Sequence, residues 1–356
     1  MFDKKTIKGI PKSEENLEEN VNGYHVFGQN ISYQYPQKVI NDSKYLTVLE
    51  KNKPIIAYTS STAQIGIINE SFYRTGNNGA FQGLFPKFSE NNFNIMVFIL
   101  ECIKRTFIDF GYNTSMANVL DIKIQVPIKN QELDFDFMNT FIAELEAERI
   151  AELSAYLKVS GLDNYELSVE ELKALQDYDS IEWREFNLEK LFGKSTRGKR
   201  LKSSDRIKGD LPFVTAGETN TGISAFIGND VEVFKANTTT VDMFGSAKYR
   251  NYEYGADDHI AVVHTENLNK FASLFVTTAI HRASNTGKFS YDRNFYAKDA
   301  DELIISLPVN CTGNINYEFM ALLTQAIQKI VIKDVVRYAD ERIEATNEVV
   351  AEHNTI

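Results

Sequence analysis

Short apolar runs and longer stretches with helical periodicity alternate along the chain. The short runs are rich in branched or aromatic residues and are bounded by Gly, Asn, Ser or Asp, as is typical of short strands. They are residues 55–59, 65–68, 213–214 and 260–263. Helical spacing predicts helices over residues 94–107 and 270–283. The mixture predicts an α+β fold with irregular, mostly antiparallel sheet.

The sequence also repeats itself at about half its length. The segment IQVPI (residues 124–128) leads to LDFDFM (133–138), and ISLPV (305–309) leads to INYEFM (315–320). The prolines of the two copies stand 181 residues apart and the methionines 182, counted from Pro127 to Pro308 and from Met138 to Met320. Each half is therefore predicted to end in a strand, an Ile-x-x-Pro exit and a long helix.

Both predicted long helices begin at a capping residue, Asp134 or Asn316. Their apolar positions recur every three to four residues, which indicates one apolar side on each helix. The residues expected to pair the two helices are Met138, Phe141, Leu145 and Leu153 in the first, and Met320, Leu323, Ile327, Val331 and Val335 in the second. Either helix alone is compatible with a core helix of its own domain. Two helices at equal spacing after the same exit motif favour a paired spacer.

The first helix is expected to break at Ser160-Gly161, and a short segment to begin at Ser168, where Glu171 completes a capping box. With 356 residues, 43% apolar and 24% charged, the chain is long enough for two globular domains. It has no apolar run of membrane-spanning length and no signal-peptide pattern at its start. The two cysteines have no metal-binding spacing, which suits a reducing cytoplasm.

The formal net charge of −11 by itself argues against nucleic acid as a partner, but the charge is unevenly distributed. Seven of the fifteen residues from Lys194 to Lys208 are basic, whereas acidic residues gather elsewhere. This basic run predicts a local cationic face, and a merely solvated charge cluster is the alternative. Its candidate DNA contacts are Lys194, Arg197, Lys199, Arg200 and Lys202.

The motifs that would suggest catalysis are incomplete. Residues 193–199 spell GxxxxGK, but Arg200 follows where a nucleotide site needs Ser or Thr. Residues 257–259 (DDH) are interpreted as a turn before a strand and not as a metal site, because adjacent residues on an extended chain point to alternating faces. We therefore predict no catalytic and no metal site in this chain.

Polar and aromatic side chains gather on predicted loops, where Arg, Gln, Asn, Ser and Thr can read base edges and Lys can hold phosphates. Any one such loop is compatible with an ordinary surface loop, but together with the basic run they favour DNA binding. The further candidates are Thr62, Gln64, Tyr73, Arg74, Lys248, Tyr249, Arg250 and Lys288.

Several of these segments resemble the target-recognition domain of restriction–modification specificity subunits. The resemblance is specific in the second half, in WREFNLEKLF (183–192), TVDMFGSAKYR (240–250) and GADDHI (255–260). It is looser in the first half, over residues 62–69 and 120–127, where a Trp-x-x-Phe opening is missing.

The similar proteins are the S subunits of type I systems and the subunits of BcgI-type (type IIB) enzymes. The resemblance implies two β-rich target-recognition domains, related by a pseudo-twofold duplication and separated by two long antiparallel helices. The expected domains are residues 1–130 for the first reader, 131–178 for the central spacer helix and linker, 179–312 for the second reader, and 313–356 for the C-terminal spacer helix.

The resemblance further implies a non-catalytic, cytoplasmic subunit that reads a bipartite target in double-stranded DNA and directs partner methyltransferase and endonuclease subunits to it. S-adenosylmethionine, with magnesium and ATP left open, would be bound by those partners and not by this chain. Whether the partners are separate methyltransferase and nuclease/translocase chains or one fused chain also stays open. The competing interpretations are a protein-interaction adaptor without a DNA role and a nuclease in its own right.

Overall fold

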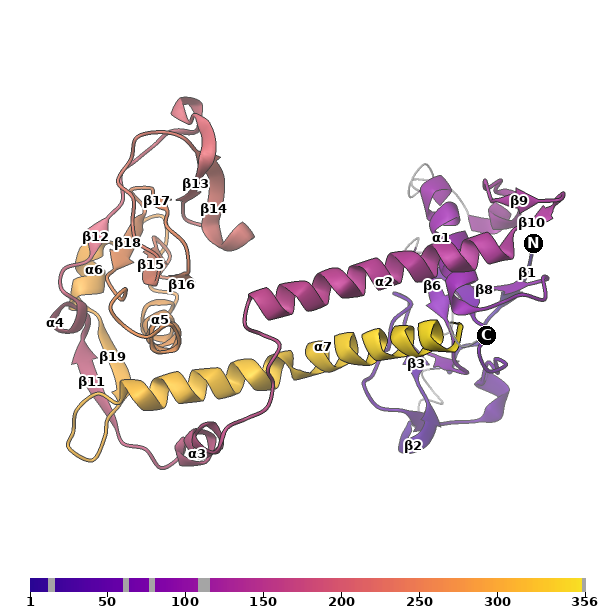
Figure 1. The fold of residues 1–356 in the computed structure, drawn as a ribbon, viewed down its shortest axis with the longest axis horizontal. Helices are drawn as coiled ribbons and strands as arrows, with labels where there is room; N and C mark the ends of the chain where they lie inside the picture. Colours follow the sequence, from indigo (N-terminus) through magenta and orange to yellow (C-terminus); the bar gives the residue numbers. More distant parts are fainter. Residues whose placement is uncertain (12–16, 60–63, 77–80, 108–115, 354–356) are drawn as a thin grey trace. The chain divides into compact units, whose positions relative to one another are not determined.

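The chain folds into two compact units. The computed structural model describes residues 1–11, 17–59, 64–76, 81–107 and 116–353. Unit 1 comprises Met1–Leu153 and Arg342–Ile356, and unit 2 comprises Ser154–Glu341. Helix α2 (Phe135–Val159) begins in unit 1 and ends in unit 2, and helix α7 (Tyr317–His353) begins in unit 2 and ends in unit 1 (Figure 1).

Unit 1 is built on an antiparallel sheet of four strands in the order β1-β8-β5-β6. These strands are β1 (Phe2–Thr6), β8 (Phe81–Pro86), β5 (Ile55–Thr59) and β6 (Ile65–Ile68). Helix α1 (Phe93–Phe107) packs on the sheet. Smaller pairs join β2 (Glu18–Tyr24) to β4 (Val39–Ile40), β3 (Val26–Phe27) to β7 (Tyr73–Arg74), and β9 (Ile128–Lys129) to β10 (Glu132–Leu133).

Strand β5 is the centre of the unit 1 core because both of its faces are covered. Ile56 and Tyr58 pack with Ile95 and Ile99 of α1, whereas Ile55 lies in a separate cluster on the other face. A strand covered on both faces reads as a continuous apolar run, as the sequence predicted for residues 55–59. Burial raises the pKa of Tyr58 to about 12.

Unit 2 contains a four-stranded antiparallel sheet in the order β12-β18-β15-β16, and a three-stranded sheet in the order β14-β13-β17. Their strands are β12 (Thr196–Arg197), β18 (Ile260–Val263), β15 (Thr238–Asp242), β16 (Ala247–Arg250), β14 (Ile223–Ile227), β13 (Lys208–Val214) and β17 (Gly255–Ala256). A separate antiparallel pair joins β11 (Trp183–Asn187) to β19 (Ile304–Pro308).

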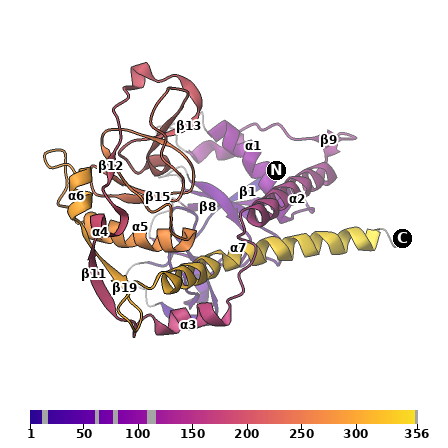
Figure 2. The same ribbon diagram turned by 60° about the vertical axis from the view of Figure 1, so that its left-hand side comes forward.

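Helix α5 (Lys270–Ser284) covers the sheet of unit 2 (Figure 2). Its Ala272, Val276 and Ile280 pack with Val241 of β15 and Met320 of α7 in one core cluster. The shorter helices are α3 (Val169–Asp177), α4 (Leu188–Phe192) and α6 (Ala297–Glu302). The α+β class and the helices predicted near residues 94–107 and 270–283 are confirmed.

The internal repeat is confirmed in atomic detail at the start of the two long helices. The backbone N–H of Asp134 donates to the carbonyl of Pro127 (3.1 Å), and that of Asn316 donates to the carbonyl of Pro308 (2.9 Å). Each side chain then caps its helix by accepting a third-residue N–H at 3.0 Å. The two halves therefore share the same capping arrangement, on exits that differ in length by one residue.

The repeat is broken just before these exits. In the second half the exit strand β19 pairs with β11, which begins at Trp183. In the first half residues 122–127 form no strand, and the short strand β9 begins only at Ile128, after the Ile-x-x-Pro exit. The first half has no Trp-x-x-Phe segment to supply a matching partner strand, and an unpaired strand lacks its ladder hydrogen bonds.

The apolar positions predicted to pair the long helices are used differently. Met138 and Met320 are fully buried in the cores of their own units, and Leu323 packs against Ala174 of α3. The other members are largely exposed, except the half-buried Leu153: Phe141, Leu145, Ile327, Val331 and Val335. Periodicity predicted the two helices correctly. Beyond their first turns, however, the apolar side that it indicated is not the side of each helix that is buried.

A different set of helix positions is buried, and it follows the repeat. Ser154 and Leu157 of α2 are buried, and adding 182 gives Val336 and Ala339 of α7, which are buried too. An ion pair of 3.6 Å joins Arg342 of α7 to Glu146 of α2 within unit 1. The duplication therefore extends along both helices on this second side.

Helix α2 ends as the sequence predicted. Gly161 has a φ of +64°, and Leu162 donates its N–H to the carbonyl of Leu157 (2.8 Å), which closes the helix with a left-handed turn. Ser168 and Glu171 form the predicted capping box of α3. In the described residues no helix is both long and apolar enough to cross a membrane.

Candidate nucleic-acid interface

The basic run begins just before β12, follows the loop after it and ends at the first residue of β13, and this loop is held by contacts within unit 2. A Cβ at Gly198 would overlap the carbonyl oxygens of Ala256 and Asp257, so only glycine permits this close approach. Lys199 donates its N–H to the carbonyl of Ala256 (2.9 Å), and Leu201 donates its N–H to the carboxylate of Asp257 (3.2 Å). The GxxxxGK sequence thus packs against β17.

The side chains of two arginines of the run form hydrogen bonds within unit 2. Arg197 donates from Nε to the carbonyl of Asp258 (2.7 Å) and lies over the ring of Tyr296. Arg206 donates to the carbonyl of Leu201 and to the hydroxyl of Ser224, and it lies over the ring of Phe213. Arg206 thus fixes the loop to β13 and β14, and Arg197 fixes β12 to the turn before β18.

The remaining cations of the run project into solvent. Lys199 is 80% exposed and lies 3.8 Å from Glu232, a long and weak ion pair. The four that have no hydrogen-bond or ion-pair partner within the described part of the chain are Lys194, Arg200, Lys202 and Lys208. Their charges are therefore exposed to solvent, and the first three remain predicted DNA contacts.

The DDH segment forms the predicted turn into β18, where Ile260 donates its N–H to the carbonyl of Asp257 (3.0 Å). The ligand atoms of Asp257, Asp258 and His259 do lie within 4.8 Å of one another. The guanidinium of Arg197 already lies 3.4 Å from the Asp258 carboxylate and supplies positive charge there.

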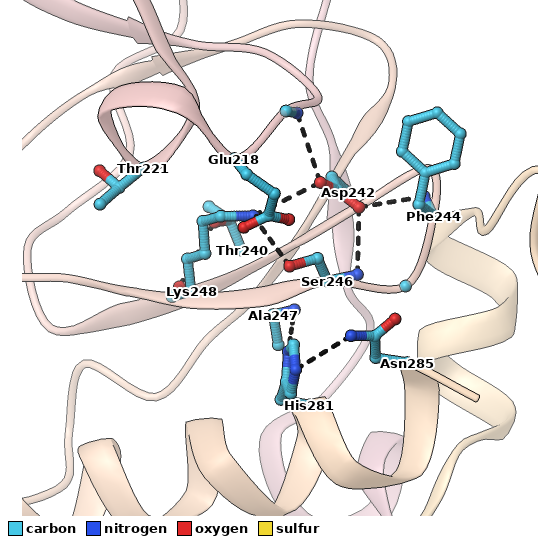
Figure 3. A network of polar contacts seen from close by, with 12 residues as sticks. Glu218, Thr221, Thr240, Asp242, Phe244, Ser246, Ala247, Lys248, His281 and Asn285 are labelled. Atoms are coloured by element: carbon cyan, nitrogen blue, oxygen red, sulfur yellow. Dashed lines mark hydrogen bonds and ion pairs between the residues drawn. The ribbon is translucent and has the colours of Figure 1, made fainter. Parts of the chain in front are cut away.

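Lys248, a predicted DNA contact, is enclosed in a polar network (Figure 3). Its Nζ lies 3.1 Å from the Glu218 carboxylate, 2.9 Å from the Ser246 hydroxyl and 3.5 Å from the Asp242 carboxylate. Only 13% of the side chain is exposed. Hydrogen bonds from Ser246 and Lys248 lower the pKa of Glu218, whose own side chain is 76% exposed.

Asp242 organises the hairpin between β15 and β16. One carboxylate oxygen accepts the N–H groups of Phe244 and Ser246, each at 3.0 Å. The other accepts the N–H of Gly217 at 3.4 Å, which connects the hairpin to the turn after β13 (Figure 3). On the helix side, His281 accepts the N–H of Ala247 at Nδ1 (3.1 Å).

Arg250 and Tyr249 are corrected from DNA contacts to structural residues. Arg250 is 1% exposed and donates to the hydroxyls of Thr240 (2.9 Å) and Tyr252 (3.0 Å). The hydroxyl of Tyr249 donates to the Asn237 side chain (2.9 Å), and burial raises its pKa. Arg250 therefore points into unit 2, where DNA cannot reach it, and the half-buried Tyr249 uses its hydroxyl in a contact within unit 2.

Tyr73 and Arg74 of unit 1 need the same correction, since each is only 2% exposed. The Tyr73 hydroxyl donates to the carbonyl of Asn41 (2.6 Å), and Arg74 donates to the carbonyl of Gly76 (2.7 Å) and lies over the Phe81 ring. Burial lowers the pKa of Arg74. These contacts stabilise the loops of unit 1.

The remaining candidates have mixed outcomes. Gln64 and Lys288 are exposed on their loops, as a contact residue requires. Thr62 lies outside the described residues.

The sequence interpretation missed the exposed turn between β13 and β14, residues 218–221 (ETNT). The glycines that flank it, Gly217 and Gly222, were the available signal.

Comparison with known proteins assigns the chain to a family. The family model for the type I restriction modification DNA specificity domain matches residues 1–155 and again 180–337. The chain belongs to this family. The two matches coincide with the two copies of the repeat, so this specificity-domain protein carries the domain twice.

Individual proteins to which this chain is similar are specificity subunits of restriction enzymes. The specificity subunit S.BcgI of a type II restriction enzyme from Heyndrickxia coagulans is 27% identical over 263 residues, covering 72% of this chain and 73% of that protein. The crystal structure of the type I restriction–modification S subunit from M. genitalium matches with a TM-score of 0.57 at 13% identity. This match covers 98% of this chain and 91% of that one, and shows that the two proteins share a fold.

Proposed function

We propose that this specificity-domain protein reads a bipartite target in double-stranded DNA and directs partner methyltransferase and endonuclease subunits to it. The observation that carries the proposal is the duplication, in which two copies of one reader each end in an equally capped helix. Two readers in one chain suit a target made of two half-sites.

The length of the spacer suits the period of DNA. Helix α2 has 25 residues, and at 1.5 Å per residue it extends about 37 Å. One turn of B-DNA advances about 34–36 Å. Readers separated by such a helix would meet the same groove one turn apart, and the gap between the half-sites would follow from helix length.

Local charge supports the DNA role despite the net charge of −11. The exposed cations on the β12–β13 loop place positive charge next to the strands of the second reader. Phosphate contacts position a protein on DNA without reading its sequence. Side chains on neighbouring loops would supply the base readout.

Exposed apolar residues support docking of partner subunits. Ile327, Val331 and Val335 recur every four residues on α7, and Val331 is 73% exposed. Such a row on a long helix suits an amphipathic helix of a partner protein. The methyltransferase would bring S-adenosylmethionine, and magnesium or ATP would come with further partners. This chain would act without a catalytic residue of its own.

Mapping methylated adenines tests the proposal. The chain would be co-expressed with its methyltransferase partner in cells without other adenine methylation, and the modified sites would be sequenced. We expect one motif of two short half-sites with a fixed gap, which is absent when this chain is omitted. Methylation without a preferred site would contradict the proposal and favour the adaptor interpretation. Metal-dependent cleavage of DNA by the isolated chain would instead favour a nuclease.

A further inference from the structure

The turn that joins β13 to β14 presents a row of polar side chains to solvent. The turn exposes four consecutive side chains, those of Glu218, Thr219, Asn220 and Thr221. The residues expected from the sequence to contact DNA nearby, Lys248 and Arg250, lie beneath it.

The backbone of the turn adopts an unfavourable conformation at two adjacent positions. Asn220 has φ 47° and ψ 38°, and Thr221 has φ 54° and ψ 25°. Left-handed backbone is tolerated by Asn but is rare for a β-branched residue such as Thr. Conformations of this kind persist only where the surroundings enforce them, and they gather at functional sites.

Four contacts from unit 2 enforce the turn. The N–H of Gly217 donates to Asp242 (3.4 Å), the Lys248 ammonium contacts Glu218 (3.1 Å), and Arg250 donates to the Thr221 hydroxyl (3.4 Å). The turn is closed where the N–H of Thr215 donates to the carbonyl of Gly222 (2.8 Å). Asp242 and Arg250 are themselves buried and fixed by further hydrogen bonds, so the turn rests on a rigid base.

The exposed side chains are of the types that distinguish bases. An Asn amide can bond adenine in a bidentate manner, a Glu carboxylate can accept from the amino group of cytosine, and Thr can bond to several bases. The same strands carry the basic loop, since Arg206 of the run donates to Ser224 of β14 (3.2 Å). Side chains suited to phosphate binding and side chains suited to base reading therefore lie on connected segments of unit 2, namely the β12–β13 loop and the β13–β14 turn.

We propose that Glu218, Thr219 and Asn220 determine which bases the second reader accepts, and that Asp242, Lys248 and Arg250 are positioning residues that hold them. This inference rests on the proposed DNA-reading function and adds the residues that read.

The test uses Asn220→Gly in the complete complex with the methyltransferase partner. Glycine accepts the left-handed backbone, so this substitution removes the side chain without adding strain. The matched control is Asn267→Gly, an exposed asparagine in the β18–α5 connection, at the opposite end of β15 from Asp242. Glu218→Gln, which keeps shape and removes charge, is a second and independent variant.

Adenine methylation would be measured on a DNA library in which each base of both half-sites is varied. In the Asn220→Gly complex, we expect the preference for the correct base over the others to fall roughly 5- to 150-fold at one position of one half-site. Glu218→Gln should change the preference at another position of that half-site. The other half-site, the gap and the behaviour of the Asn267→Gly control should stay as in the wild type.

Three results would overturn the inference. If both variants keep every base preference while the wild type shows a gapped motif, the turn does not read bases and the proposed function stands. If methylation falls equally on all sequences, the turn contributes affinity or stability only. If the wild type itself shows no gapped motif, the proposed function fails and this inference fails with it.

Discussion

Neutralising the four cations of the basic run whose side chains have no partner among the described residues should change how salt affects DNA binding. The variant carries Lys194→Gln, Arg200→Gln, Lys202→Gln and Lys208→Gln, all at exposed positions of the β12–β13 region. Each phosphate contact steepens the slope of log affinity against log salt by about 0.9 for B-DNA. If all four contact phosphates, the slope should become shallower by about 3.6.

The expected magnitude is large enough to measure by fluorescence anisotropy. Raising monovalent salt fourfold, from about 50 to about 200 mM, should cost the wild-type complex about 150-fold more affinity than it costs the variant, since 4 to the power 3.6 is about 150. The loss should be similar on cognate and unrelated DNA, because phosphate contacts carry no direct sequence information.

A charge-matched control separates local contacts from net charge. It replaces with Gln four basic residues of unit 1 that already have an acidic partner: Lys53, Lys87, Lys104 and Arg149. Both variants lower the formal net charge of −11 by four. The control should keep a slope within about one unit of the wild type. An unchanged slope in the test variant, or an equal change in both, would refute the assignment of the basic run to DNA.

Three further predictions concern the fold and its thiols. Arg250→Met should lower the free energy of unfolding by about 2–4 kcal/mol, because the buried side chain donates to several hydroxyls, and urea denaturation would measure it. Asp134→Ala and Asn316→Ala should each cost about 1 kcal/mol in the same assay, and a clear difference between them would contradict the equivalence of the two caps. The exposed Cys311 should react with a thiol reagent at neutral pH before Cys102, whose pKa is raised by burial, as mass spectrometry of the labelled protein would show.

Local signals in the sequence predicted much of the fold because their physics is local. The caps at Asp134 and Asn316 depend on side-chain and backbone groups within a few residues, and both form as expected. The helix-pairing side was wrong because periodicity identifies an apolar side but not what covers it. Met138 and Met320 pack into separate cores, and Val331 on the same side is exposed.

Residue type misled the choice of DNA contacts for a related reason. Arginine and tyrosine can bind DNA, but they can equally satisfy buried hydroxyls and carbonyls, and the sequence does not show burial. Tyr73 and Arg74 form strand β7, Arg250 is the last residue of β16, and all three side chains lie inside the protein. The polar turn 218–221 is exposed, but it contains neither an aromatic nor a basic residue and was therefore not among the predicted contacts.

The predicted contact residues hold the fold, and the exposed turn carries the proposed reading side chains. This separation suggests how a recognition domain can change what it reads without losing its fold. The groups that hold the turn act on a backbone N–H, a carboxylate and a hydroxyl, and the side chains of Thr219 and Asn220 take part in none of these contacts. Substitutions at those two positions would therefore leave the base of the turn intact, provided position 220 tolerates left-handed backbone. Asn, Asp and Gly do so most readily, so the conformation that exposes the reading side chain also limits which residues can replace it.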